Sequence, residues 1–394
     1  MTASYDESLR LHTPFHSRVQ LACEVNEWAD WKGYTTPDCY TEVEKEYFAI
    51  RAGTAVFDLT PMTKYRITGP DAEAYLDRLV TRNVAKIKVG RVVYTVWCDD
   101  NGQVVDDGTI FRLGEQEFRL CSYERVIDWM LWSAVGFDVQ IVDETADVAA
   151  LAVQGPTSCA VLMAMGLDEL QDLKPFGITT FPFEGSKLTV SRTGFTGDLG
   201  YELWIKPELA EALWDKLFAA KDDYMIMPMG SHALNVARIE AGFVQAGVDF
   251  VAAEQVIRNG RSRSPLELGL SWLVDFDKPV FNGRKALLKQ KAEGPRYRFV
   301  KLDVEGNKPA EHSFIYCGRK VVGTVTSAAW CPTAKTNVAF ASIEMPYGKK
   351  TDDLYAEIYY MRELHWTRVM AKCSVISKPV FDPPRRHATP APNF

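Results

Sequence analysis

The sequence predicts an α+β protein, in which hairpins and helices are mixed up to about residue 295 and a small β-barrel follows. Two observations support this prediction. Before residue 295, runs with helical spacing of apolar residues lie among short strand-like runs, without the regular strand–helix alternation of a parallel sheet. Beyond residue 295, only short, evenly spaced strand-like runs remain, which is typical of a barrel or a sandwich.

The composition is that of a globular protein and argues against several classes of function. The chain has 394 residues, of which 47% are hydrophobic and 25% charged, and its net charge is −7. A negative net charge argues against a general nucleic-acid binder. We expect no membrane span and no secretory signal, because no apolar run is long enough for either. The eight scattered cysteines are typical of reduced thiols in a cytoplasmic protein.

The motifs of the common nucleotide, zinc and serine-hydrolase sites are missing from the sequence. The histidines and cysteines do not form a complete zinc-ligand pattern, so we expect no metal site. We therefore expect a site that is assembled from segments distant in the sequence.

The elements before residue 295 follow from local patterns. A helix is predicted over 71–82, where apolar residues share one face and Gly69-Pro70-Asp71 supplies the turn and the N-cap. Strand-like runs at 92–97 and 103–111 flank Asn101-Gly102, a dipeptide typical of a tight hairpin. Further helices are predicted at 125–134, after 155–156, at 208–220 and at 231–241, and further strands at 139–142, 149–153, 188–192 and 200–205.

A domain boundary is predicted near residue 295. A helix expected over 284–291 is followed by a turn-rich connector. Beyond it, strands are expected at 299–302, 320–326, 338–343, 355–360 and 368–375. We therefore divide the chain into a first region over 1–295, a β-barrel domain over 296–382 and a Pro-rich flexible tail over 383–394.

Two adjacent carboxylates, Asp106 and Asp107, follow the predicted hairpin turn. Because side chains alternate along a strand, these two are expected on opposite faces. Burial and neighbouring groups would tune the pKa of the one that faces the interior. The alternative is that both are surface carboxylates close to a turn.

The run SRTGFTGDLGYE, from Ser191 to Glu202, combines three glycines with aromatic and acidic residues. Glycine lets the backbone approach a planar ligand closely, and Phe195 and Tyr201 would stack on that ligand. An inward Glu202 would offer two acceptors to a ring that bears N–H donors. The alternative is a glycine-rich hairpin with incidental aromatics.

Motifs spread over residues 40–382 resemble the aminomethyltransferase family, which includes the T-protein of the glycine cleavage system and related tetrahydrofolate-dependent demethylases. The run from Ser191 to Glu202 is the most specific of these motifs. Others are the Asp106-Asp107 pair, VFDL at 56–59, GPDA at 69–72, VQGP at 153–156, ARIEAG at 237–242, SPLELGL at 264–270, FNGRKAL at 281–287 and KPVF at 378–381.

The resemblance implies a folate-binding fold, with two intertwined α+β domains over 1–295 and a C-terminal β-barrel, and tetrahydrofolate as the cofactor in a central channel. It places Asp107 at the catalytic carboxylate and Glu202 at the residue that holds the pterin ring. Tyr94 falls at an aromatic position that lines the folate site. Phe195, Tyr201 and Arg238 complete the expected cofactor-binding set.

Three positions depart from the glycine-cleavage members of the family. Phe195 stands in place of a tyrosine, Leu234 in place of an arginine and Pro61 in place of a histidine. The glycine-cleavage enzyme takes its aminomethyl group from a lipoyl carrier protein. Changes at several positions that line the site therefore favour a different, small-molecule donor.

Four aromatic residues, Trp28, Trp31, Tyr34 and Tyr40, cluster in the segment 27–40, and the first three are the candidate substrate residues. Indole faces attract methylated ammonium or sulfonium groups by about 0.5–2 kcal/mol per ring. This segment is predicted to line the substrate site, for a methylated cation or a methoxyaromatic donor. The alternative is a packed amphipathic surface segment.

The predicted function is the transfer of a methyl or methylene unit from a small methylated donor to tetrahydrofolate. The donor classes are an amine or betaine, a methoxyaromatic, or a sulfonium. One alternative is the aminomethyltransferase (T-protein) of the glycine cleavage system, which needs the lipoyl carrier protein as its partner. A second alternative is a folate-binding protein without enzymatic activity. In each case we expect a cytoplasmic protein without nucleic-acid or membrane partners.

Overall fold

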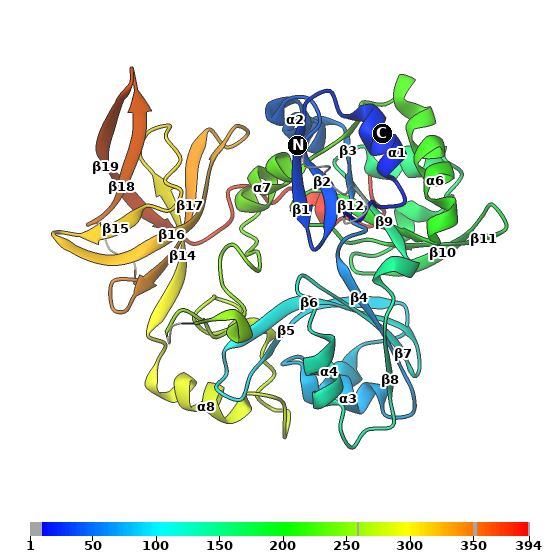
Figure 1. The fold of residues 1–394 in the computed structure, drawn as a ribbon, viewed down its shortest axis with the longest axis horizontal. Helices are drawn as coiled ribbons and strands as arrows, with labels where there is room; N and C mark the ends of the chain where they lie inside the picture. Colours follow the sequence, from blue (N-terminus) through cyan, green and yellow to red (C-terminus); the bar gives the residue numbers. More distant parts are fainter. Residues whose placement is uncertain (1–9, 258–259, 350–352, 393–394) are drawn as a thin grey trace, which may run out of the picture.

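The structure is a computed structural model that describes residues 10–257, 260–349 and 353–392. The described chain forms a six-stranded sheet, a five-stranded sheet and a closed six-stranded barrel, arranged around a common centre (Figure 1). The predicted α+β class with a C-terminal β-barrel is confirmed. No helix among the described residues is long and apolar enough to cross a membrane.

The six-stranded sheet has the order β10–β11–β12–β9–β3–β13. Only the β3–β13 pair is parallel. The side chains between this sheet and α5 and α6 form a large hydrophobic core. The bounds are β3 Thr54–Asp58, β9 Ala149–Gln154, β10 Ile178–Phe183, β11 Ser186–Ser191, β12 Gly200–Ile205, β13 Ile226–Pro228, α2 Val43–Ala52, α5 Ser158–Ala164, α6 Ala210–Phe218 and α7 Ser231–Glu240.

The five-stranded sheet is antiparallel, with the order β5–β6–β7–β4–β8. Its strands lie between β3 and β9 in the sequence, so the chain leaves the six-stranded sheet, builds the second sheet and returns. The two sheets are therefore interleaved along the chain. The bounds are β4 Thr63–Thr68, β5 Arg91–Cys98, β6 Val104–Gly114, β7 Glu117–Ser122, β8 Gln140–Asp143, α3 Ala72–Leu79 and α4 Ile127–Ser133.

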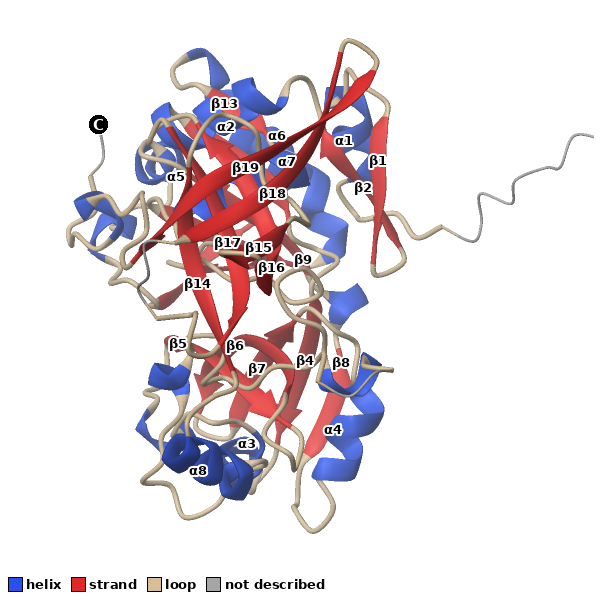
Figure 2. Cartoon of the chain, turned by 90° about the vertical axis from the view of Figure 1, so that its left-hand side faces the viewer, coloured by secondary structure: helices blue, strands red, loops and turns tan. Residues whose placement is uncertain are grey.

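The barrel closes in the order β14–β17–β16–β15–β18–β19 around its own apolar core. The β18–β19 hairpin extends beyond the barrel, since β15 pairs with β18 only up to Glu357 and β14 pairs with β19 only from Cys373 (Figure 2). The bounds are β14 Tyr297–Val304, β15 Phe314–Cys317, β16 Lys320–Cys331, β17 Thr336–Glu344, β18 Leu354–Arg362 and β19 His365–Ile376. α8 (Arg284–Glu293) precedes the barrel.

A two-stranded hairpin near the N-terminus forms a sheet of its own. It consists of β1 (Glu27–Trp31) and β2 (Tyr34–Cys39), and α1 (His16–Ala22) precedes it. Lys32 and Gly33 both have positive φ, at 53° and 90°, as a tight two-residue hairpin turn requires. The hairpin runs along the six-stranded sheet and its turn reaches towards the five-stranded sheet (Figure 1).

The segment for which the sequence predicted a flexible tail makes defined contacts over its described residues, 383–392. Arg192 donates hydrogen bonds to the carbonyl of Ala388 at 2.7 Å and to the hydroxyl of Thr389 at 3.3 Å. Arg385 forms a two-bond ion pair with buried Asp198, at 2.6 and 2.7 Å. Two buried polar side chains of the first region thus find hydrogen-bond partners in this segment.

Most of the predicted helices and strands are present, but several strands and the helices α1 and α2 were not predicted. β3 is buried along its whole length, so its sequence TAVFD shows no alternation of apolar and polar residues. β13 and β15 are only three and four residues long. The other strands missing from the prediction are β1, β2, β4, β7 and β10.

Candidate functional site

Asp107 and Tyr94 form the first half of the candidate site, on the β5–β6 hairpin. Asp107 lies opposite Val96 and Tyr94 lies opposite Thr109, so Tyr94 and Asp107 are diagonal neighbours on one face. The Tyr94 hydroxyl donates a hydrogen bond of 2.5 Å to Asp107 Oδ2. The other oxygen, Oδ1, accepts no hydrogen bond from the described residues, and the side chain is half-buried. Asp107 therefore has one oxygen that is held by the protein and one that is available to a ligand.

Asp106 lies on the opposite face of β6, across from buried Trp97, as the alternation predicted. It is fully buried, and it accepts the backbone N–H of Asp107 at 2.8 Å and that of Glu124 at 2.7 Å. The two adjacent carboxyls thus differ in what they do. Asp106 fixes the backbone, and Asp107 faces the site.

Burial raises the pKa of Asp107 to about 6, although the hydrogen bond from Tyr94 lowers this pKa and the charge of Asp249 raises it further. The pKa of Asp106 is raised well above its ordinary value by burial and by the neighbouring Asp107. A carboxyl whose pKa lies near neutral pH is suited to hold or release a proton.

Glu202 forms the second half of the candidate site, on β12. Its neighbours across the strands are Ser191 on β11 and Ala152 on β9. Its Oε2 accepts hydrogen bonds from Thr193 at 2.5 Å and from Ser191 at 3.3 Å, whereas Oε1 accepts none from the described residues. Burial raises the pKa of Glu202 to about 7, against the lowering effect of these two hydroxyls.

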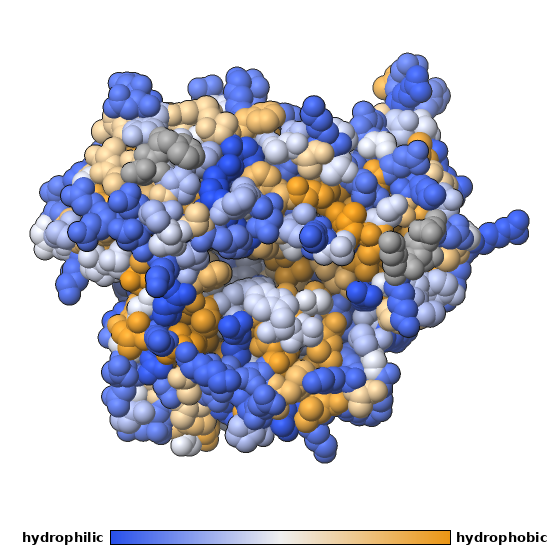
Figure 3. All heavy atoms as spheres, turned by 180° about the vertical axis from the view of Figure 1, so that it is seen from behind, coloured by the Kyte–Doolittle hydropathy of each residue, from blue (hydrophilic) through white to orange (hydrophobic). Residues whose placement is uncertain are grey.

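The faces that carry Asp107 and Glu202 pack against each other. Phe111 shares a face with Asp107, and Trp204 shares a face with Glu202. The rings of Phe111 and Trp204 meet edge to face, with centroids 5.1 Å apart. Both carboxyls therefore lie on the inner sides of the two sheets, and the space-filling view shows the molecule hollowed near its middle (Figure 3).

The three glycines of the run at 191–202 have a structural role that differs from the predicted one. A Cβ on Gly194 or Gly200 would come within 2.0 or 2.3 Å of Gln154 Oε1. Gly197, at φ +76°, would place its Cβ 2.4 Å from that of Ala241. The glycines make room for the buried side chain of Gln154 and for Ala241 at the end of α7. At these positions the backbone therefore comes close to other protein atoms and not to a ligand.

Tyr201 lies on the face of β12 opposite to Glu202. Its ring is fully buried in the core of the six-stranded sheet, and its hydroxyl has no hydrogen-bond partner among the described residues. Adjacent residues of a strand cannot face the same side, so Tyr201 cannot stack on a ligand that Glu202 holds. Phe195 is half-buried and packs on Phe243, with ring centroids 5.6 Å apart.

Arg238, expected among the cofactor-binding residues, belongs to a buried network between α7 and the barrel. Its five N–H groups bind Asn235 twice, the carbonyl of Phe243, Asp249 at 2.5 Å and Ser327 at 2.7 Å. Asp249 also accepts from the hydroxyls of Ser327 and Thr326. No donor of Arg238 remains for a ligand, so its contacts join the barrel to the rest of the chain.

Of the predicted substrate residues, Trp31 and Tyr34 are partners across the β1–β2 hairpin, whereas Trp28 packs elsewhere. Trp31 packs on Phe57 with centroids 5.7 Å apart, and its indole N–H is buried without an acceptor among the described residues. Tyr34, directly across the hairpin from Trp31, is buried and has the Arg125 guanidinium 5.9 Å from its ring centre. Trp28 packs on His16 and the hydrophobic core instead.

Four side chains of this region were not predicted from the sequence. The hydroxyls of Ser191 and Thr193 orient Glu202, and their place within the glycine-rich run was the available signal. Lys32 binds Glu124, with the two side chains 22% and 8% exposed. Nothing in the local sequence pattern of either residue indicates this contact, since 92 residues separate them.

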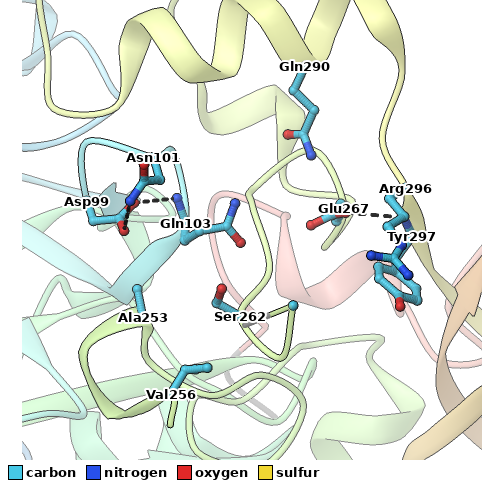
Figure 4. A pocket seen from close by; sticks show the side chains of 11 residues that line it. Asp99, Asn101, Gln103, Ala253, Val256, Ser262, Glu267, Gln290, Arg296 and Tyr297 are labelled. Carbon is cyan, nitrogen blue, oxygen red and sulfur yellow. Dashed lines mark hydrogen bonds between the residues drawn. The ribbon is translucent and has the colours of Figure 1, made fainter. Parts of the chain in front are cut away.

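A separate cavity of about 410 Å³ lies between the β5–β6 turn, α8 and the start of the barrel (Figure 4). Its polar lining includes Asp99, Glu267 and Gln290. The carboxylate of Glu267 accepts the backbone N–H groups of Ser264 and Tyr297. None of the predicted site residues lines this cavity, so it is distinct from the candidate site.

Two family models match the chain. The GCVT N-terminal domain matches residues 20–278, and the glycine cleavage T-protein C-terminal barrel domain matches residues 297–382. The second match spans the barrel strands, and the first spans both interleaved sheets.

Curated relatives and a solved structure are similar to this chain. An aminomethyltransferase of Halothermothrix orenii is 32% identical over 327 residues, which cover 82% of this chain and 88% of that protein. A trimethylamine-oxide aldolase of Ruegeria pomeroyi is 33% identical over 362 residues, 88% of this chain and 44% of that protein. The crystal structure of the glycine cleavage system aminomethyltransferase T from Bartonella henselae has the same fold, with a TM-score of 0.82 at 24% identity, covering 94% of this chain and 98% of that one.

Proposed function

This chain belongs to the aminomethyltransferase family and is a one-carbon-group transferase, and we propose that it moves a one-carbon unit from a small donor to tetrahydrofolate: a methyl unit from a methylated donor, or a methylene unit from an aminomethyl donor. One observation carries the proposal. Asp107 and Glu202 are half-buried on the inner sides of two packed sheets, and each keeps one carboxyl oxygen that no described residue occupies.

The surroundings of Glu202 fit the pterin ring of tetrahydrofolate. Two hydroxyls hold Oε2, so Oε1 is left to accept a hydrogen bond from a ring N–H. The ionised form binds such donors more strongly than the protonated form. When bound, tetrahydrofolate supplies the nucleophilic nitrogen that receives the one-carbon unit.

Asp107 is the proposed catalytic carboxyl. The Tyr94 hydroxyl fixes Oδ2 and so orients Oδ1. An amine or aryl-ether donor develops charge or needs a proton as its carbon departs, and a carboxyl with a pKa of about 6 serves either need. A sulfonium donor needs little such help, so the presence of Asp107 favours an amine or an aryl ether.

The donor is proposed to bind beneath the β1–β2 hairpin, where the Trp31 N–H has no acceptor among the described residues. Two protein cations already approach aromatic rings there. Lys32 Nζ lies 4.3 Å from the ring centre of Tyr123, and Arg125 lies over Tyr34. The charge of Lys32 is balanced by Glu124, but the Arg125 guanidinium would repel a bare methylated cation. A donor that carries a hydrogen-bond acceptor or a carboxylate, such as a methoxybenzoate or an N-methylated amino acid, suits the site better.

The second candidate function is the aminomethyltransferase (T-protein) of glycine cleavage. The names of several relatives at 30–32% identity favour it. This function would require a lipoyl carrier protein as partner, and Phe195, Leu234 and Pro61 argue against it because they depart from the pattern of glycine-cleavage members.

A product assay tests the proposal. The full chain is incubated with excess tetrahydrofolate and, separately, with N-methylated amino acids, betaines, methoxybenzoates, dimethylsulfoniopropionate, or glycine-cleavage components with lipoyl carrier protein. One-carbon-substituted folate formed with a small donor is the expected result. If product forms only with the lipoyl system, the second candidate function is supported instead. If no product forms under any of these conditions, the proposal is contradicted.

We also propose that the protein acts in the cytoplasm. All eight cysteines are free, which fits a reducing compartment.

A further inference from the structure

The turn of the β1–β2 hairpin connects the two sheets that carry the candidate site. On one side, Trp31 packs on Phe57. Phe57, Ala152 and Glu202 lie next to one another across β3, β9 and β12, so Trp31 covers the face that carries Glu202. On the other side, the adjacent Lys32 forms a 2.5 Å ion pair with Glu124, just beyond the end of β7 in the five-stranded sheet.

A chain of contacts continues from this ion pair to the proposed catalytic carboxyl. The backbone N–H of Glu124 donates to Asp106 Oδ2 at 2.7 Å, and Asp106 Oδ1 accepts the backbone N–H of Asp107 at 2.8 Å. Asp106 is fully buried, and both of its oxygens are used in this way. Glu124 is therefore linked to the backbone of Asp107 through the buried carboxylate of Asp106.

The Lys32–Glu124 pair is more protected from water than an ordinary surface pair. Its side chains are 22% and 8% exposed, and the ammonium of Lys32 also lies over the Tyr123 ring. The pair of Lys45 and Glu42, by comparison, is 59% and 61% exposed. Exposed pairs contribute little, whereas breaking a desolvated pair leaves a charge without its partner.

We propose that the β1–β2 hairpin is a strap across the donor side of the reaction site, and that Lys32 is a positioning residue whose ion pair with Glu124 holds the strap and the Asp106–Asp107 segment in place. This inference rests on the proposed function for its kinetic consequence. The strap itself is a property of the fold. Without the ion pair, the donor meets an open site, and Asp107 is less well placed for the transfer.

Kinetics with the donor found active give the first test. Lys32→Met removes the charge and keeps most of the side-chain length, Lys32→Arg keeps the charge, and Lys45→Met breaks the exposed pair as the matched control. We expect Lys32→Met to raise the KM for the donor and lower kcat, together by roughly tenfold to a hundredfold in kcat/KM. The Kd for tetrahydrofolate, measured by fluorescence titration, stays within about twofold of the wild type, because Glu202 is untouched. Lys32→Arg recovers most of the loss, and Lys45→Met behaves as the wild type.

Amide hydrogen exchange of the full chain gives a second test that needs no turnover. In Lys32→Met, peptides that cover 27–39 and 120–126 are expected to exchange at least about tenfold faster, while the barrel is unchanged. Glu124→Gln, which keeps the shape of the side chain, should show the same pattern. Unchanged exchange in both variants overturns the strap, whether or not any donor is active. If the wild type is inactive with every donor, the proposed function is contradicted. The hydrogen-exchange result then still shows whether the Lys32–Glu124 pair holds the strap in place.

Discussion

At the scale of single residues, two neighbouring carboxyls in one strand carry different tasks because they face different surroundings. Asp106 is buried and accepts hydrogen bonds from two backbone N–H groups. Asp107 accepts a hydrogen bond from Tyr94 and faces the candidate site. The pKa values of both are raised by burial, but of the two only Asp107 keeps an oxygen to which no described residue donates a hydrogen bond.

The hydrogen bond from Tyr94 stabilises the ionised form of Asp107 and so lowers the pKa of this carboxyl. Tyr94→Phe removes that hydrogen bond, and the pKa of Asp107 is expected to rise above its value of about 6. The limb of the kcat/KM profile against pH that Asp107 sets should therefore move to higher pH. Asp107→Asn should remove this limb and most of the activity. A limb that stays in place in Tyr94→Phe contradicts the assignment of Asp107.

The raised pKa of Glu202 makes the free energy of unfolding depend on pH. The pKa of its carboxyl is about 7 in the folded protein and 4.5 as the ordinary value, so between these values the folded state holds a proton that the unfolded state has lost. The free energy of unfolding therefore falls as pH rises through this window. Glu202→Gln cannot ionise, so its stability relative to the wild type should increase from pH 5 to pH 8 in urea denaturation. The exposed Glu208→Gln serves as the control and should show no such trend.

At the scale of elements, side chains alternate between the two faces of β12, so Tyr201 faces the hydrophobic core and Glu202 faces the candidate site. Tyr201 belongs to the core, and its hydroxyl is buried without a partner among the described residues. Tyr201→Phe is expected to leave the Kd for tetrahydrofolate unchanged and to leave stability unchanged or raise it by about 1 kcal/mol, since an unsatisfied polar group is removed. A large loss of tetrahydrofolate affinity in calorimetric titration would restore the ligand-stacking role that the sequence suggested.

α7 is joined to the barrel by the buried pair of Arg238 and Asp249. Arg238→Met leaves the Asp249 carboxylate buried without its counter-charge, and we expect a loss of about 3–5 kcal/mol in the free energy of unfolding. The double variant with Asp249→Asn should be milder than the single one, because no buried charge is left alone. Equal losses in the two variants would speak against the ion pair as the cause.

At the scale of the whole molecule, a ligand held between the two sheets should stabilise the fold as a unit. Tetrahydrofolate at a hundred times its Kd is expected to add about 2.7 kcal/mol to the free energy of unfolding. Calorimetry should therefore show a rise in Tm that Glu202→Gln largely abolishes. A rise that survives this substitution would place the folate away from Glu202.

What the sequence by itself determined is local or carried by motifs. The Asn101-Gly102 turn predicted the hairpin, the period of two placed Asp106 and Asp107 on opposite faces, and motifs along the chain indicated the family. Strand-like runs without helices indicated the barrel.

What only the tertiary structure decided is which partners those side chains meet. Gly194 and Gly200 make room for the side chain of Gln154. Arg238 donates its hydrogen bonds to Asp249 and neighbouring groups, and Lys32 of the hairpin binds Glu124. The physical reason is that local patterns of polarity report which side of an element is buried. They do not report which distant segment buries it, and that choice is made by the packing of the whole chain.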